Sequence, residues 1–91
     1  MKGYVSREQT VWCWTGLNQD DPLAKRLNVE RHAYLTEMID SGKHAPNWAC
    51  SGHRQESGPI APQARREGWR FTSERGWMCP SCLRALKRLD L

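Results

Sequence analysis

Long apolar runs are absent from this chain of 91 residues, and so are the motifs of common catalytic sites. No stretch approaches the roughly 20 apolar residues that a membrane-spanning helix needs. The first residues also contain no apolar run of the kind that a signal peptide has. We therefore expect a cytoplasmic protein that does not enter a membrane. Phosphate-binding loops, dinucleotide fingerprints, H-E-x-x-H and serine elbows are also missing, so the sequence predicts neither an enzyme nor a small-molecule substrate.

Apolar material is scarce as well, with one phenylalanine and 38% hydrophobic residues. A chain of this length buries only a modest core, and small scaffolds often depend on a metal or disulfide for stability. A structural zinc ion can contribute on the order of 10 kcal/mol to folding. We expect a single domain over residues 1–91, with a strand and helix subregion at 1–47 and a zinc-binding subregion at 48–91.

Two short motifs place soft metal ligands three positions apart: C-S-G-H at 50–53 and C-P-S-C at 79–82. This spacing is typical of structural zinc, because one tight turn then supplies two of the four tetrahedral ligands. The predicted ligands of one structural Zn²⁺ are Cys50, His53, Cys79 and Cys82.

Three alternatives to this zinc site stay open. Cys13 in place of His53 would give a four-cysteine site; otherwise Cys13 is a buried thiol that packs as a small apolar side chain. Ferrous iron is an alternative metal for such thiolates. Two disulfides are the other use of four cysteines, and an oxidising compartment would favour them.

One long helix is predicted from Pro22 to about Ser41, with Asp21 as its N-cap. Its apolar stripe consists of Leu23, Leu27, Tyr34, Leu35, Met38 and Ile39. Before this helix, β-branched and aromatic residues predict a strand over residues 9–15. After the first ligand motif we expect a loop at 54–59, a helix at 61–67, a strand at 69–72, a turn at 73–76, a return strand at 77–79 and a helix at 82–89.

This order of elements resembles the treble-clef zinc fingers, with zinc ribbons as a close second. The segment from Cys50 to Cys82 is also similar to zinc-finger segments of small phage and bacterial proteins. The matching motifs are C-S-G-H at 50–53, A-R-R-E-G-W at 64–69 and G-W-M-C-P-S-C at 76–82. His53 stands where the commoner pattern has a cysteine. The resemblance covers residues 48–91. It implies a small α+β, zinc-stabilised, treble-clef-like domain, on which the N-terminal strand and the long helix pack.

The net charge of +4 comes entirely from the second part of the chain. Residues 1–53 carry six Lys/Arg and six Asp/Glu, whereas residues 54–91 carry eight and four. A basic face is typical of proteins that bind nucleic acid or acidic proteins. Trp69 and Trp77 could stack on bases if they are exposed. The candidate phosphate contacts are Arg65, Arg66, Arg70, Arg75, Arg84, Lys87 and Arg88.

The sequence favours a non-enzymatic regulatory or interaction protein, of a kind that phages encode, which binds a cellular protein. A nucleic-acid-binding or transcription-associated zinc finger is the alternative. A contiguous basic face would favour nucleic acid, and an exposed apolar patch of more than a few hundred Å² would favour a protein partner. No sequence signature identifies the partner.

Overall fold

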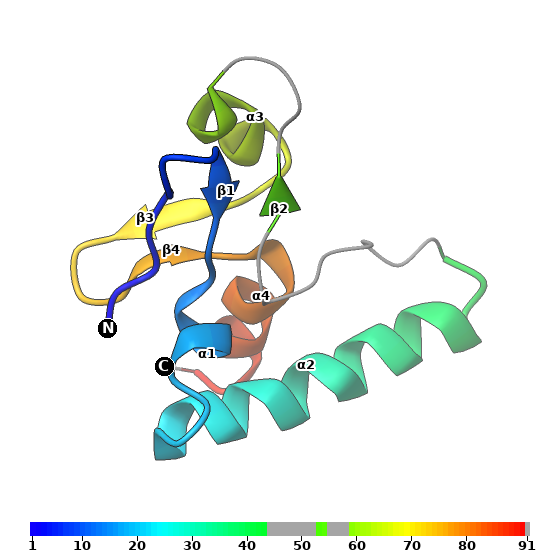
Figure 1. The fold of residues 1–91 in the computed structure, drawn as a ribbon. Helices are drawn as coiled ribbons and strands as arrows, with labels where there is room; N and C mark the ends of the chain where they lie inside the picture. Colours follow the sequence, from blue (N-terminus) through cyan, green and yellow to red (C-terminus); the bar gives the residue numbers. More distant parts are fainter. Residues whose placement is uncertain (44–52, 55–58, 91) are drawn as a thin grey trace.

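The computed structural model describes residues 1–43 and 59–90, together with the backbone of residues 53–54. Short strands and helices alternate along these residues, and one long helix dominates the first half (Figure 1). The elements in chain order are β1 (Thr10–Val11), α1 (Trp14–Leu17), α2 (Pro22–Asp40), β2 (His53–Arg54), α3 (Ile60–Arg66), β3 (Arg70–Thr72), β4 (Gly76–Met78) and α4 (Pro80–Arg88).

The strands form two antiparallel pairs. In the first pair, β1 lies beside β2, with Val11 opposite His53. In the second pair, β3 and β4 form the predicted hairpin, with Phe71 opposite Trp77. The loop expected at 54–59 is wrong at Arg54, which belongs to β2. Residues 55–58 lie outside the described part of the chain.

The N-terminal segment runs beside β4 in a parallel bridge between Gly3 and Gly76. The Gly3 N–H donates to the Arg75 carbonyl at 2.8 Å, and the Trp77 N–H donates to the Gly3 carbonyl at 3.1 Å. A Cβ atom on Gly3 would collide with the backbone carbonyls of Trp77 and Trp12. Glycine at this position is what allows the first residues to lie against the hairpin.

Helix α2 confirms the long predicted helix and its cap. The Asp21 carboxylate accepts the Leu23 N–H at 2.8 Å and the Ala24 N–H at 3.4 Å, and a proline follows at the first helical position. Only the first half of the predicted stripe reaches the core, where Leu27 is fully buried. The stripe is wrong at Ile39, which is 64% exposed because the second half of α2 extends past the core residues.

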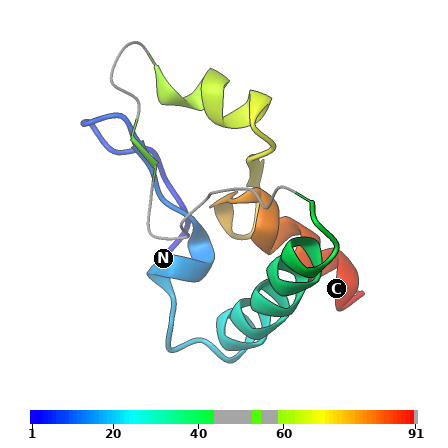
Figure 2. The same ribbon diagram turned by 90° about the vertical axis from the view of Figure 1, so that its right-hand side faces the viewer.

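Helix α4 packs beside α2 (Figure 2). Its partly buried Leu83 and Leu86 pack against the core. It begins at Pro80, two residues before the predicted start, because the Cys79 side chain caps it and proline is tolerated at the first position. The predicted helix at 61–67 is present as α3 and shifted by one residue. The predicted strand at 69–72 is also present, and it begins one residue later.

A single hydrophobic cluster joins the two predicted subregions, 1–47 and 48–91. It takes buried side chains from β1, α1 and α2 on one side and from α3, the hairpin and α4 on the other. Its residues are Val11, Cys13, Trp14, Ala24, Leu27, Ile60, Ala64, Trp69, Trp77, Met78, Cys79, Cys82 and Ala85.

The strand predicted over 9–15 is wrong beyond Val11. Cys13 is extended, with φ −79° and ψ 137°, and it serves as the N-cap of α1, which begins at Trp14. The β propensity of this stretch is outweighed by tertiary packing, since the turn at Cys13 and Trp14 directs both side chains into the core.

Candidate metal centre

Three cysteine sulfurs come together in the core. The Sγ atoms of Cys13, Cys79 and Cys82 all lie within 4.8 Å of one another, and each residue is buried. Cys13 comes from the junction of β1 and α1, whereas Cys79 and Cys82 come from the start of α4. The site therefore joins segments that are more than sixty positions apart in sequence.

The start of α4 fixes two of the sulfurs. Cys79 is the N-cap, and its Sγ accepts the Cys82 N–H at 3.4 Å. The hydroxyl of the buried Ser81 lies 3.3 Å from the same sulfur. Pro80 occupies the first helical position, so both cysteines fall on the first turn. This arrangement places Cys82 in the first helical turn.

The third sulfur is tied directly to that turn. The Cys79 N–H donates to the Cys13 Sγ at 3.4 Å. Two backbone N–H groups thus point at sulfur atoms in the cluster, beside the positive end of the α4 dipole. Such donors stabilise negative charge on sulfur, which favours the thiolate form that binds metal.

The donor set fits a tetrahedral thiolate-bound metal. Zn–S bonds of about 2.3 Å at tetrahedral angles separate ligand sulfurs by about 3.8 Å. Sulfurs within 4.8 Å of one another are close enough to that spacing to hold one ion. The members of this cluster among the described residues are all cysteines, and thiolate ligands favour zinc or iron over magnesium or calcium. Three sulfurs supply three of four ligand positions.

The predicted ligands divide between described and undescribed parts of the chain. Cys79 and Cys82 lie in the cluster. Cys50 lies outside the described residues, and His53 is described by its backbone alone, opposite Val11 in the β1–β2 pair.

Cys13, the predicted alternative to His53, is a full member of the cluster. Its sequence signal was weak, because no second ligand lies near it in the chain. The lone cysteine after an apolar strand was nevertheless the one feature that could have found it.

The candidate phosphate contacts fall into separate groups. Arg70 donates to the Arg65 carbonyl at 2.9 Å, so these two lie together at the junction of α3 and β3. Arg65 also lies over the Trp77 ring, and Arg75 lies over the Trp14 ring. Arg66 is exposed at the end of α3.

The α4 group consists of Arg84, Lys87 and Arg88, and its last member is already paired. The Arg88 guanidinium contacts Glu37 through two hydrogen bonds of 2.7 and 2.8 Å and Glu30 through an ion pair of 2.7 Å. These carboxylates neutralise Arg88, which weakens the case for it as a phosphate contact.

The tryptophans proposed for base stacking lie in the core. Trp69 is fully buried and Trp77 is 6% exposed. A ring must present a face to solvent to stack on a base, so neither indole is available for this role. Phe71, 57% exposed, is the aromatic ring of the hairpin that faces solvent.

Comparison of the chain with protein-family models, with curated proteins and with solved structures finds no match. Among the described residues, no helix combines the length and the apolar character needed to cross a bilayer. The site is therefore interpreted from its own geometry.

Proposed function

We propose that this chain is a non-enzymatic zinc-binding interaction protein, in which one structural Zn²⁺ holds a treble-clef-like fold together. The observation that carries this proposal is the buried cluster of Cys13, Cys79 and Cys82 at the start of α4. A hairpin followed by a helix that carries two ligands on its first turn also supports a treble clef over a ribbon.

We propose Cys50 as the fourth ligand, so that the site contains Cys13 in place of His53. With Cys13 beside Cys79 and Cys82, one further ligand completes a tetrahedron. A four-cysteine site follows from the alternative in which Cys13 replaces His53. A site with four protein ligands leaves no open position for water or substrate, so a structural role is the one this set supports.

A protein partner fits this chain better than a nucleic acid does. Charge is the main argument for nucleic acid, and the excess of +4 is modest. The burial of Trp69 and Trp77 excludes these two indoles from base stacking, and the pairing of Arg88 removes one of the candidate phosphate contacts. Binding a cellular protein, in the manner of small phage-encoded regulators, is therefore the function we propose.

The test is the metal content of the purified protein and of single-ligand variants. Cys13→Ser and Cys82→Ser each replace a soft sulfur with a hydroxyl of similar size, so we expect them to lower bound zinc from about one equivalent to a small fraction. Elemental analysis after desalting measures the equivalents of zinc and of iron that are bound per protein chain. His32→Ala is the matched control, because His32 is exposed on α2 and has no partner at ligand spacing.

Full zinc retention by Cys13→Ser would exclude Cys13 from the site and return His53 to it. Protein purified under reducing conditions without any bound zinc or iron, and unable to take up added Zn²⁺, would refute the metal centre altogether. Equal loss in His32→Ala would mean that the variants report general instability.

A further inference from the structure

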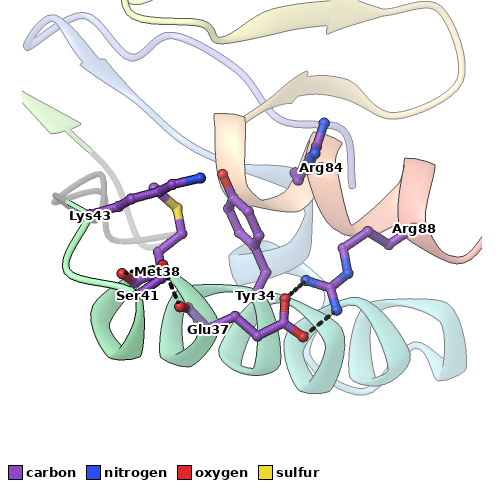
Figure 3. A pocket seen from close by; sticks show the side chains of 7 residues that line it. All are labelled: Tyr34, Glu37, Met38, Ser41, Lys43, Arg84 and Arg88. Carbon is purple, nitrogen blue, oxygen red and sulfur yellow. Dashed lines mark hydrogen bonds and ion pairs between the residues drawn. The ribbon is translucent and has the colours of Figure 1, made fainter.

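A groove lies between the second half of α2 and the exposed side of α4, away from the cysteine cluster. It encloses a hollow of about 480 Å³, which falls within the roughly 300–1,000 Å³ of typical ligand pockets. Its lining residues are Tyr34, Glu37, Met38, Ser41, Lys43, Arg84 and Arg88. Figure 3 shows Tyr34 and Met38 rising from α2 on the same side, with Lys43 beside Met38 and Arg84 beyond Tyr34.

The charges of this groove are not balanced. Arg88 engages both oxygens of Glu37 and also pairs with Glu30, so one guanidinium is shared by two carboxylates. Arg84 lies 5.8 Å from the centre of the Tyr34 ring, a contact that leaves its positive charge uncompensated. Across residues 1–43 and 59–90, neither Lys43 nor Arg84 forms an ion pair. The cations of Lys43 and Arg84 are therefore available to bind an anionic ligand.

Tyr34 and Met38 contribute apolar surface to the groove. Tyr34 and Met38 are partly exposed, although they continue the stripe whose first half is buried in the core. Methionine adapts its shape to different apolar partners, and a tyrosine ring offers a broad apolar face. An apolar side chain of a ligand would be buried here. A phosphate backbone has no apolar side chain to bury.

We propose that this groove binds a peptide segment of a partner protein that carries a carboxylate side chain next to an apolar one. Lys43 and Arg84 would contact the carboxylate, and Tyr34 and Met38 would contact the apolar side chain. Two cations without ion pairs match one or two carboxylates. A protein that binds duplex DNA commonly makes about 6–10 phosphate contacts. The inference rests on the proposed protein-binding function and names its surface and the chemistry of its partner.

The probe is a short fluorescein-labelled peptide of alternating glutamate and leucine, titrated with the zinc-loaded full chain and followed by fluorescence polarisation. We expect saturable binding that weakens at least about tenfold in the double variant Lys43→Glu/Arg84→Glu, because like charges then face the carboxylates. Lys25→Glu/Arg26→Glu is the matched control: it makes the same change in net charge at exposed positions outside the groove. We expect it to change the affinity by less than about twofold.

Three further measurements decide between outcomes. The same peptide with glutamine in place of glutamate should bind at least about tenfold more weakly. The NMR signal of the Met38 methyl group should shift on titration with the glutamate peptide. Zinc content of each variant, measured in the same samples, separates failure of the groove from failure of the metal centre.

No polarisation change up to about 1 mM protein, or equal weakening in both double variants, would overturn the groove as the binding site. A labelled single-stranded oligonucleotide is the competing probe. Tight oligonucleotide binding that the groove variant abolishes, without peptide binding, would assign this surface to nucleic acid instead.

Discussion

Cys79 performs two tasks with one sulfur atom. Its Sγ caps α4 by accepting the Cys82 N–H, and it lies beside the sulfurs of Cys13 and Cys82. Serine is a good N-cap but a poor ligand for a soft metal. A Cys79→Ser variant thus separates the two tasks, since it keeps the cap and removes the ligand.

The identity of the fourth ligand is decided by a pair of substitutions in the C-S-G-H motif. If Cys50 completes the site, Cys50→Ser should lose most of the zinc and His53→Ala should keep it. A chromogenic chelator competing for the metal measures the loss, and each lost ligand should raise the metal dissociation constant at least about tenfold. Zinc loss in His53→Ala with retention in Cys50→Ser would refute the four-cysteine set.

Local sequence identified the two candidate ligands that are neighbours in the chain, and it gave less weight to Cys13, which has no neighbouring ligand. Cys79 and Cys82 share a turn, and their spacing alone suggested a site. Cys13 joins them through a hydrogen bond to a residue 66 positions away, and only packing brings the two together. A ligand without a partner at short spacing looks the same in sequence as a buried structural cysteine.

Among the elements, the N-terminal segment depends on a glycine for its contact with β4. Gly3→Ala would place a methyl group against the carbonyls of Trp77 and Trp12, so we expect a loss of about 2–4 kcal/mol in unfolding free energy. Chemical denaturation of the zinc-loaded protein measures this change. Gly42→Ala is the control, because Gly42 has a positive φ of 75° but no atoms within 4 Å of an added Cβ.

We expect Gly42→Ala to lower the free energy of unfolding by about 1 kcal/mol, from backbone strain alone. Equal effects of the two substitutions would mean that the bridge between Gly3 and Gly76 contributes nothing to stability.

A second element-level feature is the clamp that Arg88 forms between α4 and α2. The hydrogen bond from Arg88 lowers the pKa of Glu37. A lowered carboxyl pKa contributes stability that is present above the ordinary glutamate pKa and is lost as the pH falls through the lowered pKa of Glu37. Arg88→Met should therefore lower Tm near neutral pH, and the difference from the original protein should shrink in acid.

Thermal unfolding at pH 7 and at successively lower pH values at which zinc is still bound measures this difference. Arg84→Met is the matched control, because Arg84 shares the Tyr34 ring contact and has no carboxylate partner among the residues described. Its effect should not depend on pH in the same way. A difference for Arg88→Met that grows as the pH falls would contradict the clamp.

At the scale of the molecule, the cysteine cluster lies inside a hydrophobic core to which described residues from both halves of the chain contribute. Its cysteines belong to the same hydrophobic cluster as Leu27 of α2 and Ile60 of α3. Removing a metal ion from such a position should weaken all elements together, because a structural zinc contributes on the order of 10 kcal/mol to folding. The two subregions should then unfold as one.

Chelation is the corresponding experiment. Under reducing conditions, excess EDTA should abolish the far-ultraviolet circular dichroism of the helices and the fluorescence signature of the buried tryptophans in one transition. Added Zn²⁺ should restore both signals. Helical signal that survives chelation while the tryptophan signal is lost would show that α2 folds without the metal-bound part.

Periodicity, capping residues and ligand spacing, all read from the sequence, determined α2, the hairpin and the helix that begins within C-P-S-C. Those signals span a few residues and depend on local geometry. Tertiary structure alone decided that Cys13 joins the sulfur cluster, that the first residues run beside β4, and that the second half of α2 borders a groove. These features depend on which distant surfaces pack together, and hydrophobic burial, which drives that packing, is non-directional and carries no local signature.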